Sequence, residues 1–237
     1  MTQIEIGDIQ VEVDLKNIKN VHLSVHPPLG KVRIAAPSRM DIDTIRMFAI
    51  SKLSWIKRQQ QKLLSQQRES KREYLNRESH YFLGKRYLLK VIEENIKPNI
   101  LIQHDTLVLK IRPGTSTEYK HFILQEWYRE QLKELITMYI EKWEKVMNVK
   151  VDSFGVKRMK TRWGTCNSNK KKIWLNLELA KKPVQCLEYI VVHEMVHLLE
   201  RKHNERFVTY MNKFLPQWRH LRDELNNLPV SHAEWKY

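Results

Sequence analysis

Short runs in which apolar and polar residues alternate fill the first forty residues of the chain. Residues 10–14, 21–25 and 31–35 each have the period of two that is typical of a strand with one buried face. Residues 27–30, which include two prolines and a glycine, predict a turn between the second and third runs. We therefore expect a β-meander at the start of the chain.

The spacing of apolar residues then changes to every third or fourth position, which predicts one helix over residues 42–64. Asp41 stands directly before this helix, where its side chain can cap the N-terminus. The periodicity fades in the polar stretch 59–73. We interpret that stretch as a solvated helix end or linker rather than an arm that binds nucleic acid.

Two further strand-like regions precede a second, longer helix. Residues 81–91 predict a hairpin around Gly84 and Lys85, and residues 107–111 alternate again. Residues 117–147 predict a long helix with one apolar face. The apolar stripe of this helix consists of Leu124, Tyr128, Leu132, Leu135, Tyr139, Trp143 and Val146.

Together these elements predict an α+β fold in two parts, and we find no internal repeat in the sequence. Residues 1–116 form a strand-rich N-terminal region with one long helix. Residues 117–237 form a second region, rich in helices, which carries the candidate chemistry. We expect the two parts to pack against each other.

The net charge of +15 and the pI of about 9.7 predict an attraction to anionic partners such as nucleic acid. A hydrophobic content of 42% is high enough for a core and excludes wholesale disorder. The charge is diffuse, because residues 151–237 carry 16 Lys and Arg against 9 Asp and Glu, a net +7 of the total. Charge alone therefore does not locate a site.

Cys166 and Cys186 are the only cysteines, which is too few for a disulfide framework and is typical of a reducing compartment. The N-terminus does not have the pattern of a signal peptide, and no apolar run approaches the roughly 18 residues that a membrane span needs. We expect a soluble, cytoplasmic protein without a membrane partner.

The strongest chemical signal is the HExxH motif formed by residues 193–197, which lies in an apolar stretch. On a helix with about 100° per residue, His193 and His197 lie about 40° apart and one turn apart, so that both can bind one metal ion. Glu194 lies beside them and can act as a general base for an attacking water. Polar groups in such an apolar helix are costly to bury unless they are paired or bound.

A catalytic zinc usually has three protein ligands, and His203 is the candidate for the third. It follows His197 by six residues, as in the HExxHxxGxxH pattern, although Glu200 stands in the place of the glycine. Glu200 and Glu205 are weaker candidates, and Glu200 also suits a hydrogen bond to a ligand imidazole. Cys166 is either a thiolate near the metal or a small buried apolar residue.

The C-terminal region resembles the YgjP-like metallopeptidase domain, a family related to the SprT-like and WLM zinc metalloproteases. The resemblance is sharpest over residues 155–227 and rests on four segments in the order of that family. These segments are RWGTC at 162–166, IWLNLEL at 173–179, YIVVHEMVH at 189–197, and His203 followed by Phe207 and Pro216. Thr165, Met195 and Val196 depart from the usual residues of the family and leave the candidate ligands unchanged.

The resemblance implies a zincin-like metallopeptidase core, in which the HExxH helix lies beside a small sheet and His203 is the third zinc ligand. It also suggests that residues 175–179 form a strand that pairs with an extended peptide substrate, although a plain core strand is an equal alternative. Lys160 and Arg162 are basic residues that can meet a substrate carbonyl or carboxylate. Packing of Trp163 and Gly164 under the helix is the alternative reason for that segment.

We hypothesise a zinc-dependent metallopeptidase that acts on a peptide or protein. His193, His197 and His203 bind Zn²⁺, and Glu194 activates the attacking water. The candidates for stabilising the oxyanion are Arg162, Tyr210 and His220.

Two alternative functions remain open at this point. One is a non-peptidase metal-dependent hydrolase. The other is a DNA-associated protease or binding module, motivated by the basic charge.

Overall fold

The structure is a computed structural model that describes residues 2–26, 30–65, 72–159 and 162–228. Three segments discussed above are affected. Lys160 lies outside the described residues, and so do most of the expected turn at 27–30 and residues 66–71 of the polar stretch 59–73. The described residues form two units, an N-terminal unit up to residue 65 and a C-terminal unit from residue 72. The sequence placed the boundary at 116/117 instead, between strands and a helix that share one hydrophobic core.

The N-terminal unit contains a four-stranded sheet of β1 (Thr2–Ile6), β2 (Ile9–Lys16), β3 (His22–His26) and β4 (Lys31–Pro37). Its strand order is β1-β2-β4-β3, and β2 and β4 are parallel neighbours. The expected meander is therefore wrong. The physical reason is burial, because β2 and β4 carry the fully buried side chains and occupy the centre, whereas β3 is only half-buried and lies at the edge.

Two helices cover this sheet where the sequence predicted one, α1 (Ile42–Ser51) and α2 (Leu53–Ser65). The expected cap is confirmed, because Asp41 Oδ1 accepts a hydrogen bond of 2.8 Å from the backbone N–H of Thr44. The helix is interrupted at Lys52, whose φ of −105° and ψ of 5° leave the helical region. The break allows buried residues of both helices to join one core with the sheet.

The C-terminal unit begins with a second four-stranded sheet of β5 (Ser79–Phe82), β6 (Lys85–Glu93), β7 (Asn99–Gln103) and β8 (Thr106–Ile111). The expected hairpin is confirmed, and its turn consists of Leu83 and Gly84 with φ of 48° and 82°. A Cβ at Gly84 would lie 3.0 Å from the Pro183 backbone, so glycine is also needed there for close packing.

The two four-stranded sheets repeat one topology. The order β5-β6-β8-β7 has the same antiparallel outer pairs and the same parallel central pair as β1-β2-β4-β3. The sequence showed no internal repeat, because alternation specifies strands but does not specify which strands become neighbours. In both sheets a helix follows the fourth strand.

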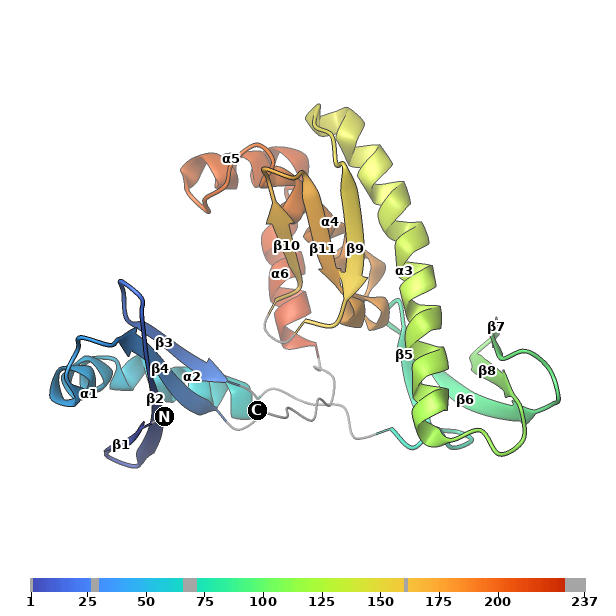
Figure 1. Ribbon diagram of the computed structural model, residues 1–237. Coiled ribbons are helices and arrows are strands. Elements are labelled where there is room, and N and C mark those ends of the chain that lie inside the picture. Colours follow the sequence, from blue (N-terminus) through green and yellow to red (C-terminus); the bar gives the residue numbers. More distant parts are fainter. Residues whose placement is uncertain (1, 27–29, 66–71, 160–161, 229–237) are drawn as a thin grey trace. The chain divides into compact units, whose positions relative to one another are not determined.

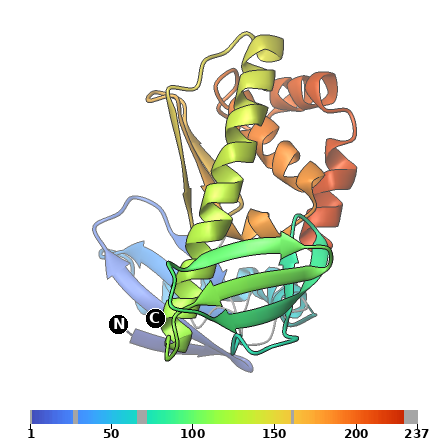
Figure 2. The same cartoon turned by 90° about the vertical axis from the view of Figure 1, so that its right-hand side faces the viewer.

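The long helix α3 (Thr117–Met147) is confirmed with its predicted bounds. Its buried face includes Ile136, Ile140 and Met147, whereas the expected Val146 is 56% exposed and Leu135 is half-buried. One turn of an α-helix takes 3.6 residues, so a stripe that advances mainly in steps of four shifts gradually around the helix. The buried stripe of α3 advances in this way, and it therefore includes Ile136 and Met147 in place of Leu135 and Val146. Figure 2 shows α3 running from the β5–β8 sheet to the next part of the unit, where it contacts β9 and α4.

A three-stranded sheet follows, formed by β9 (Ser153–Lys157), β10 (Gly164–Asn167) and β11 (Lys172–Asn176). The strand order is β10-β11-β9, with β11 antiparallel to β10 and parallel to β9. A short 3-10 helix, η1 (Leu177–Lys181), leads from β11 to α4 (Val184–Val196). Helix α4 lies against β10 and β11, behind the sheet in Figure 1, and also contacts α5 (Glu205–Phe214) and α6 (Trp218–Asn227).

The order of this sheet decides between the two roles expected for residues 175–179, a strand that pairs with a substrate and a plain core strand, against the first. The strand ends at Asn176, and the following residues form the buried start of η1. Strand β11 also has a neighbour on each side, so its backbone has no edge left for a peptide. Among the described residues, β10 forms one edge of this sheet and β9 forms the other.

The described chain is thus an α+β protein with three mixed sheets. None of its described helices combines the length and the apolar character that crossing a membrane requires.

The packing of α3 predicts the effect of truncating its core side chains. Leu132→Ala removes a fully buried side chain and should lower the free energy of unfolding of the C-terminal unit by about 3 kcal/mol. Met138, on the same helix, is 52% exposed, so Met138→Ala should cost less than about 0.5 kcal/mol. Urea unfolding followed by tryptophan fluorescence measures both, and equal losses would contradict the assigned face.

Candidate metal centre

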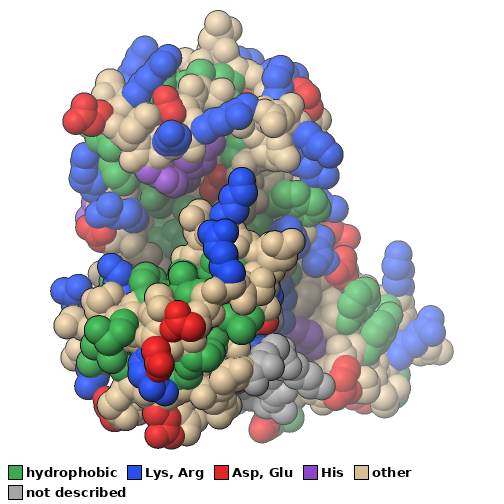
Figure 3. Space-filling view, turned by 60° about the vertical axis from the view of Figure 1, so that its left-hand side comes forward, with side chains coloured by type: hydrophobic (Ala, Val, Ile, Leu, Met, Phe, Trp, Pro, Cys, Tyr) green, Lys and Arg blue, Asp and Glu red, His purple; other side chains and the backbone are tan. Residues whose placement is uncertain are grey.

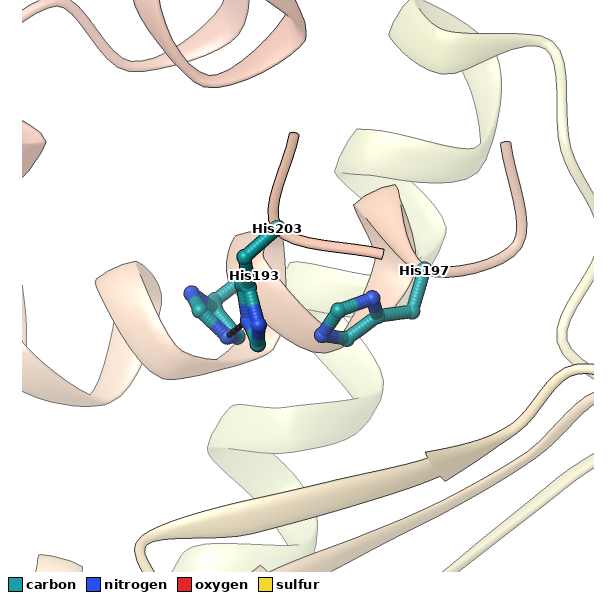
Figure 4. A group of neighbouring side chains, drawn as sticks. All are labelled: His193, His197 and His203. Carbon is teal, nitrogen blue, oxygen red and sulfur yellow. Dashed lines mark hydrogen bonds between the residues drawn. The ribbon is translucent and has the colours of Figure 1, made fainter. Parts of the chain in front are cut away.

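The side chains of His193, His197 and His203 converge on one point. One nitrogen of each ring lies within 4.8 Å of the chosen nitrogens of the other two. His193 lies in the last turn of α4, His197 caps its C-terminus, and His203 returns from the loop that precedes α5. Figure 4 shows the three rings turned toward a common space. The helical spacing of the first pair therefore does bring their rings together, as the sequence predicted.

The loop after α4 returns His203 without the glycine of the HExxHxxGxxH pattern. The backbone N–H groups of Leu198, Leu199 and Glu200 bond back to the last turn of α4, and Glu200 has no positive φ. Asn204 then caps α5 by accepting a hydrogen bond of 3.0 Å from the Phe207 N–H. The chain thus leaves α4 through a turn at residues 198–200 that needs no glycine.

This turn also orients His197. Its Nδ1–H donates a hydrogen bond of 3.1 Å to the backbone carbonyl of Glu200, so that Nε2 carries the free lone pair. The expected contact between Glu200 and a ligand imidazole is therefore present, but through the backbone rather than the carboxylate. The Glu200 carboxylate instead accepts a hydrogen bond of 3.2 Å from the Lys202 N–H.

His193 lacks such a partner. Its Nδ1 is buried and has no hydrogen-bond partner in the structure, while its Nε2 lies 3.0 Å from Nε2 of His203. The contact between the two Nε2 atoms shows which nitrogen of His193 faces the other rings, and a metal ion shared by the three imidazoles would be bound through that atom. The converging rings, rather than the unpartnered Nδ1, therefore fit a metal ion with three imidazole ligands.

Phe207 packs against the rings of all three histidines. Its side chain is 2% exposed, and its ring centroid lies 5.0 Å from that of His193, 4.8 Å from that of His197 and 4.7 Å from that of His203. The Asn204 cap fixes the start of α5 and therefore the position of Phe207. One buried aromatic residue thus limits the rotamers of all three imidazoles.

Burial lowers the pKa of His193 and of His197 and so favours their neutral forms. It lowers the pKa of His193 to about 3, with further lowering by His197 and His203. Burial also lowers the pKa of His197, although the hydrogen bond to Glu200 opposes this effect. Neutral imidazole is the form that binds metals, so this environment favours ligation.

Glu194 is almost completely buried beside the histidines, with 5% exposure. Burial raises its pKa to about 8, while the positive charge of Arg162 opposes the rise. A Cβ at Gly164 would lie 2.6 Å from Glu194 Oε1, so the glycine of β10 leaves the space that this carboxylate occupies. The expected packing of residues 163–164 near α4 is therefore observed, and it leaves space for the Glu194 carboxylate.

A cleft of about 800 Å³ opens over these side chains. It is lined by residues of β10, α4, α6 and the loops beside them. These residues include Arg162, Trp163, Gly164, Thr165, Cys166, Tyr189, Ile190, His193, Glu194, His197, Arg201, His203, Arg222, Leu225 and Asn226. Figure 3 shows histidine side chains gathered in a hollow of the upper surface, with Lys and Arg side chains around it.

The three oxyanion candidates have different positions. Arg162 lines the cleft. Tyr210 accepts a hydrogen bond from Arg206 on α5 and stacks on Phe214, and neither Tyr210 nor His220 lines the cleft. The structure therefore brings only Arg162 of these three to the histidines.

The weaker metal candidates also separate. The carboxylates of Glu200 and Glu205 do not join the converging group of ligand atoms among the described residues. Cys166 lines the cleft, but burial and the charge of Glu194 raise its pKa to about 11, so it stays a thiol.

Asn176 is a residue whose role the sequence did not reveal. It is 4% exposed, and its amide joins the two ends of the loop between β9 and β10. Its Nδ2 donates to the carbonyls of Met159 (3.0 Å) and Arg162 (2.9 Å), and its Oδ1 accepts from the Met159 N–H (3.2 Å). Asn176 thereby fixes the backbone from which Arg162 reaches the cleft.

Arg201, Arg222 and Asn226 were also missed. Arg222 and Asn226 lie on α6, which reaches the cleft because Trp218, Leu221 and Leu225 are buried in the core. The amphipathic pattern of α6 signals a packed helix, but it does not tell which other element that helix borders. No local signal in the sequence marks these residues.

Comparison with known families gives one match. The family described as YgjP-like, metallopeptidase domain, matches residues 19–228 of the chain. A search of the curated proteins gives no match.

The hydrogen bonds of Asn176 predict its contribution to stability. Asn176→Ala removes three part-buried hydrogen bonds to the backbone of Met159 and Arg162 and should lower the free energy of unfolding by about 3 kcal/mol. Asn167 accepts one exposed hydrogen bond from Lys170, so Asn167→Ala should cost about 1 kcal/mol or less. Urea unfolding compares the variants, and a loss for Asn176→Ala no larger than that of the control would contradict this role.

Proposed function

The chain belongs to the family of the YgjP-like metallopeptidase domain, and on this premise we propose that it is a zinc-dependent peptidase. The family name implies a metal-dependent enzyme that cleaves peptides or proteins. The observation that carries the proposal is the convergence of His193, His197 and His203 in a cleft that also contains Glu194. We assign the three histidines as the metal ligands.

Zinc suits this set of donors better than the harder cations. Three neutral imidazoles are a known zinc ligand set, whereas Mg²⁺ and Ca²⁺ prefer oxygen ligands. A zinc ion bound there would polarise a substrate carbonyl and lower the pKa of a water. The His197–Glu200 hydrogen bond sets the tautomer that such binding requires.

We further propose that α4 and the β9–β11 sheet form a zincin-like core. The support is that α4 lies against β10 and β11 and carries the first two histidines at its end. An extended peptide would pair with β10, an outer strand, and not with residues 175–179, for which the family resemblance suggested this role beside the equal alternative of a core strand. Strand β10 also contributes Gly164, Thr165 and Cys166 to the cleft.

Glu194 is the proposed general base. Its carboxylate takes a proton from the water that attacks the substrate carbonyl, and then delivers this proton to the leaving amide nitrogen. Burial raises the pKa of Glu194 in the metal-free protein, which makes its carboxylate a stronger proton acceptor than an exposed one. Arg162 would donate a hydrogen bond to the carbonyl oxygen as its negative charge develops.

The role of Glu194 is testable by a nearly isosteric change. Glu194→Gln should keep the zinc content of the protein and reduce peptide turnover by at least about 100-fold, because the amide cannot accept the proton. Glu205→Gln changes an exposed carboxylate outside the histidine group and should leave turnover unchanged. Zinc analysis and cleavage of a peptide library measure both effects. Unchanged turnover of the Glu194 variant would refute the assignment.

The ligand set is testable without any activity assay. His203→Ala removes one of three ligands and should weaken zinc binding by more than about 100-fold, beyond the loss typical of a residue that merely orients a ligand. His220 lies on α6 outside the cleft, so His220→Ala should bind zinc like the unchanged protein. Competition with a chelator gives the affinities, and equal affinities for both variants would exclude His203 as a ligand.

A further inference from the structure

Three arginines from separate segments line the cleft over the histidines. Arg162 precedes β10, Arg201 follows α4, and Arg222 lies on α6. Glu194 is the only carboxylate among the described residues that line the cleft, and it is buried. The walls that a ligand meets are therefore strongly cationic.

Local contacts orient these arginines. Arg222 Nε donates a hydrogen bond of 3.0 Å to the Asp223 carboxylate, and its guanidinium lies 5.4 Å from the Trp218 ring. Arg201 donates a hydrogen bond to the side chain of Asn169. A guanidinium has five N–H donors, so each contact leaves donors for a ligand.

Arg162 is placed through its backbone. The Asn176 amide bonds to the Arg162 carbonyl and holds the loop end from which its side chain projects. Its charge also acts on the buried Glu194. All three arginines thus line the cleft that also contains the histidines.

We propose that this cleft selects peptides with acidic side chains next to the bond that is cleaved. This inference rests on the proposed peptidase function and names its substrate class. Three cations in a concave site attract carboxylates and repel basic peptides, and arginine matches a carboxylate with two parallel hydrogen bonds.

The other walls favour a peptide over a more highly charged polymer. Trp163, Tyr189, Ile190 and Leu225 line the same cleft and offer apolar contacts to the side chains beside an acidic residue. Strand β10 adds backbone groups at the outer edge of the sheet. A nucleic acid would use the arginines and could stack a base on Trp163, but its backbone cannot pair with the edge of a strand.

Binding to the zinc-loaded Glu194→Gln protein tests the inference without interference from cleavage. We would compare one labelled peptide that contains two Glu residues with the same peptide in which both are Gln, using fluorescence anisotropy. The acidic peptide should bind about 10-fold more tightly at low ionic strength. This advantage should shrink as salt is added.

Helix α6 offers a matched pair of variants. Arg222→Gln should reduce the preference for the acidic peptide about 3-fold, while its affinity for the Gln peptide stays the same and serves as the control for folding. Arg219, on the same helix, also lies over the Trp218 ring but bonds to Asn212 and does not line the cleft. Arg219→Gln should therefore keep the full preference.

Several outcomes would overturn the inference. Equal affinities for the two peptides, or equal losses in the two arginine variants, would show that these arginines do not select acidic residues. Tighter binding of a DNA strand or a phosphate ester that depends on Arg222 would assign the arginines to another ligand class.

Cleavage by the protein with Glu194 intact separates this inference from the proposed function. If neither peptide is cleaved but the acidic peptide binds preferentially, the peptidase function fails and the selectivity stands. If both peptides are cleaved equally well, the peptidase function stands and the selectivity fails.

Discussion

The constraint on which the site depends is the burial of helix α4. Nine of its thirteen residues are buried, against β10 and β11 on one side and against other helices elsewhere. A helix in such surroundings can carry polar side chains only where they find partners or open into a cleft. The two histidines and Glu194 lie at its C-terminal end, where α4 meets the cleft. Burial there keeps the imidazoles neutral and raises the proton affinity of the carboxylate.

The surrounding elements serve this one helix. Phe207 of α5 packs against all three imidazoles, Gly164 of β10 leaves room for Glu194, and α3 contacts α4 along its buried face. The β5–β8 sheet shares a core with α3, which explains why residues before 117 belong to the same unit as the histidines. The family match, over residues 19–228, likewise extends far beyond the segment that carries the three histidines. The chemistry occupies a short segment, but its geometry depends on most of the chain.

The sequence predicted the residues of the candidate site better than it predicted the fold. His193 and His197 are related by helix geometry alone, and His203 follows at a short interval, so local rules could bring them together. Neighbours in a sheet are chosen by long-range packing, which alternation does not encode, and this explains the failure of the β-meander and of the substrate strand at 175–179. Asn176 and Arg222 were missed for the same reason. Their roles arise from segments that meet only in the folded chain.

The distribution of the positive charge, rather than its total, bears on the candidate site. A net charge of +15 spread along the chain does not locate a site, and exposed charges are screened within about 8 Å in physiological salt. Three of these charges line one concavity, and Glu194 is the single carboxylate among the described residues that line it. A confined set of cations acts on a ligand at short range and through hydrogen bonds of fixed direction, which a diffuse charge cannot do. On the selectivity proposed for the cleft, the position of a few arginines matters more than the total charge of the chain.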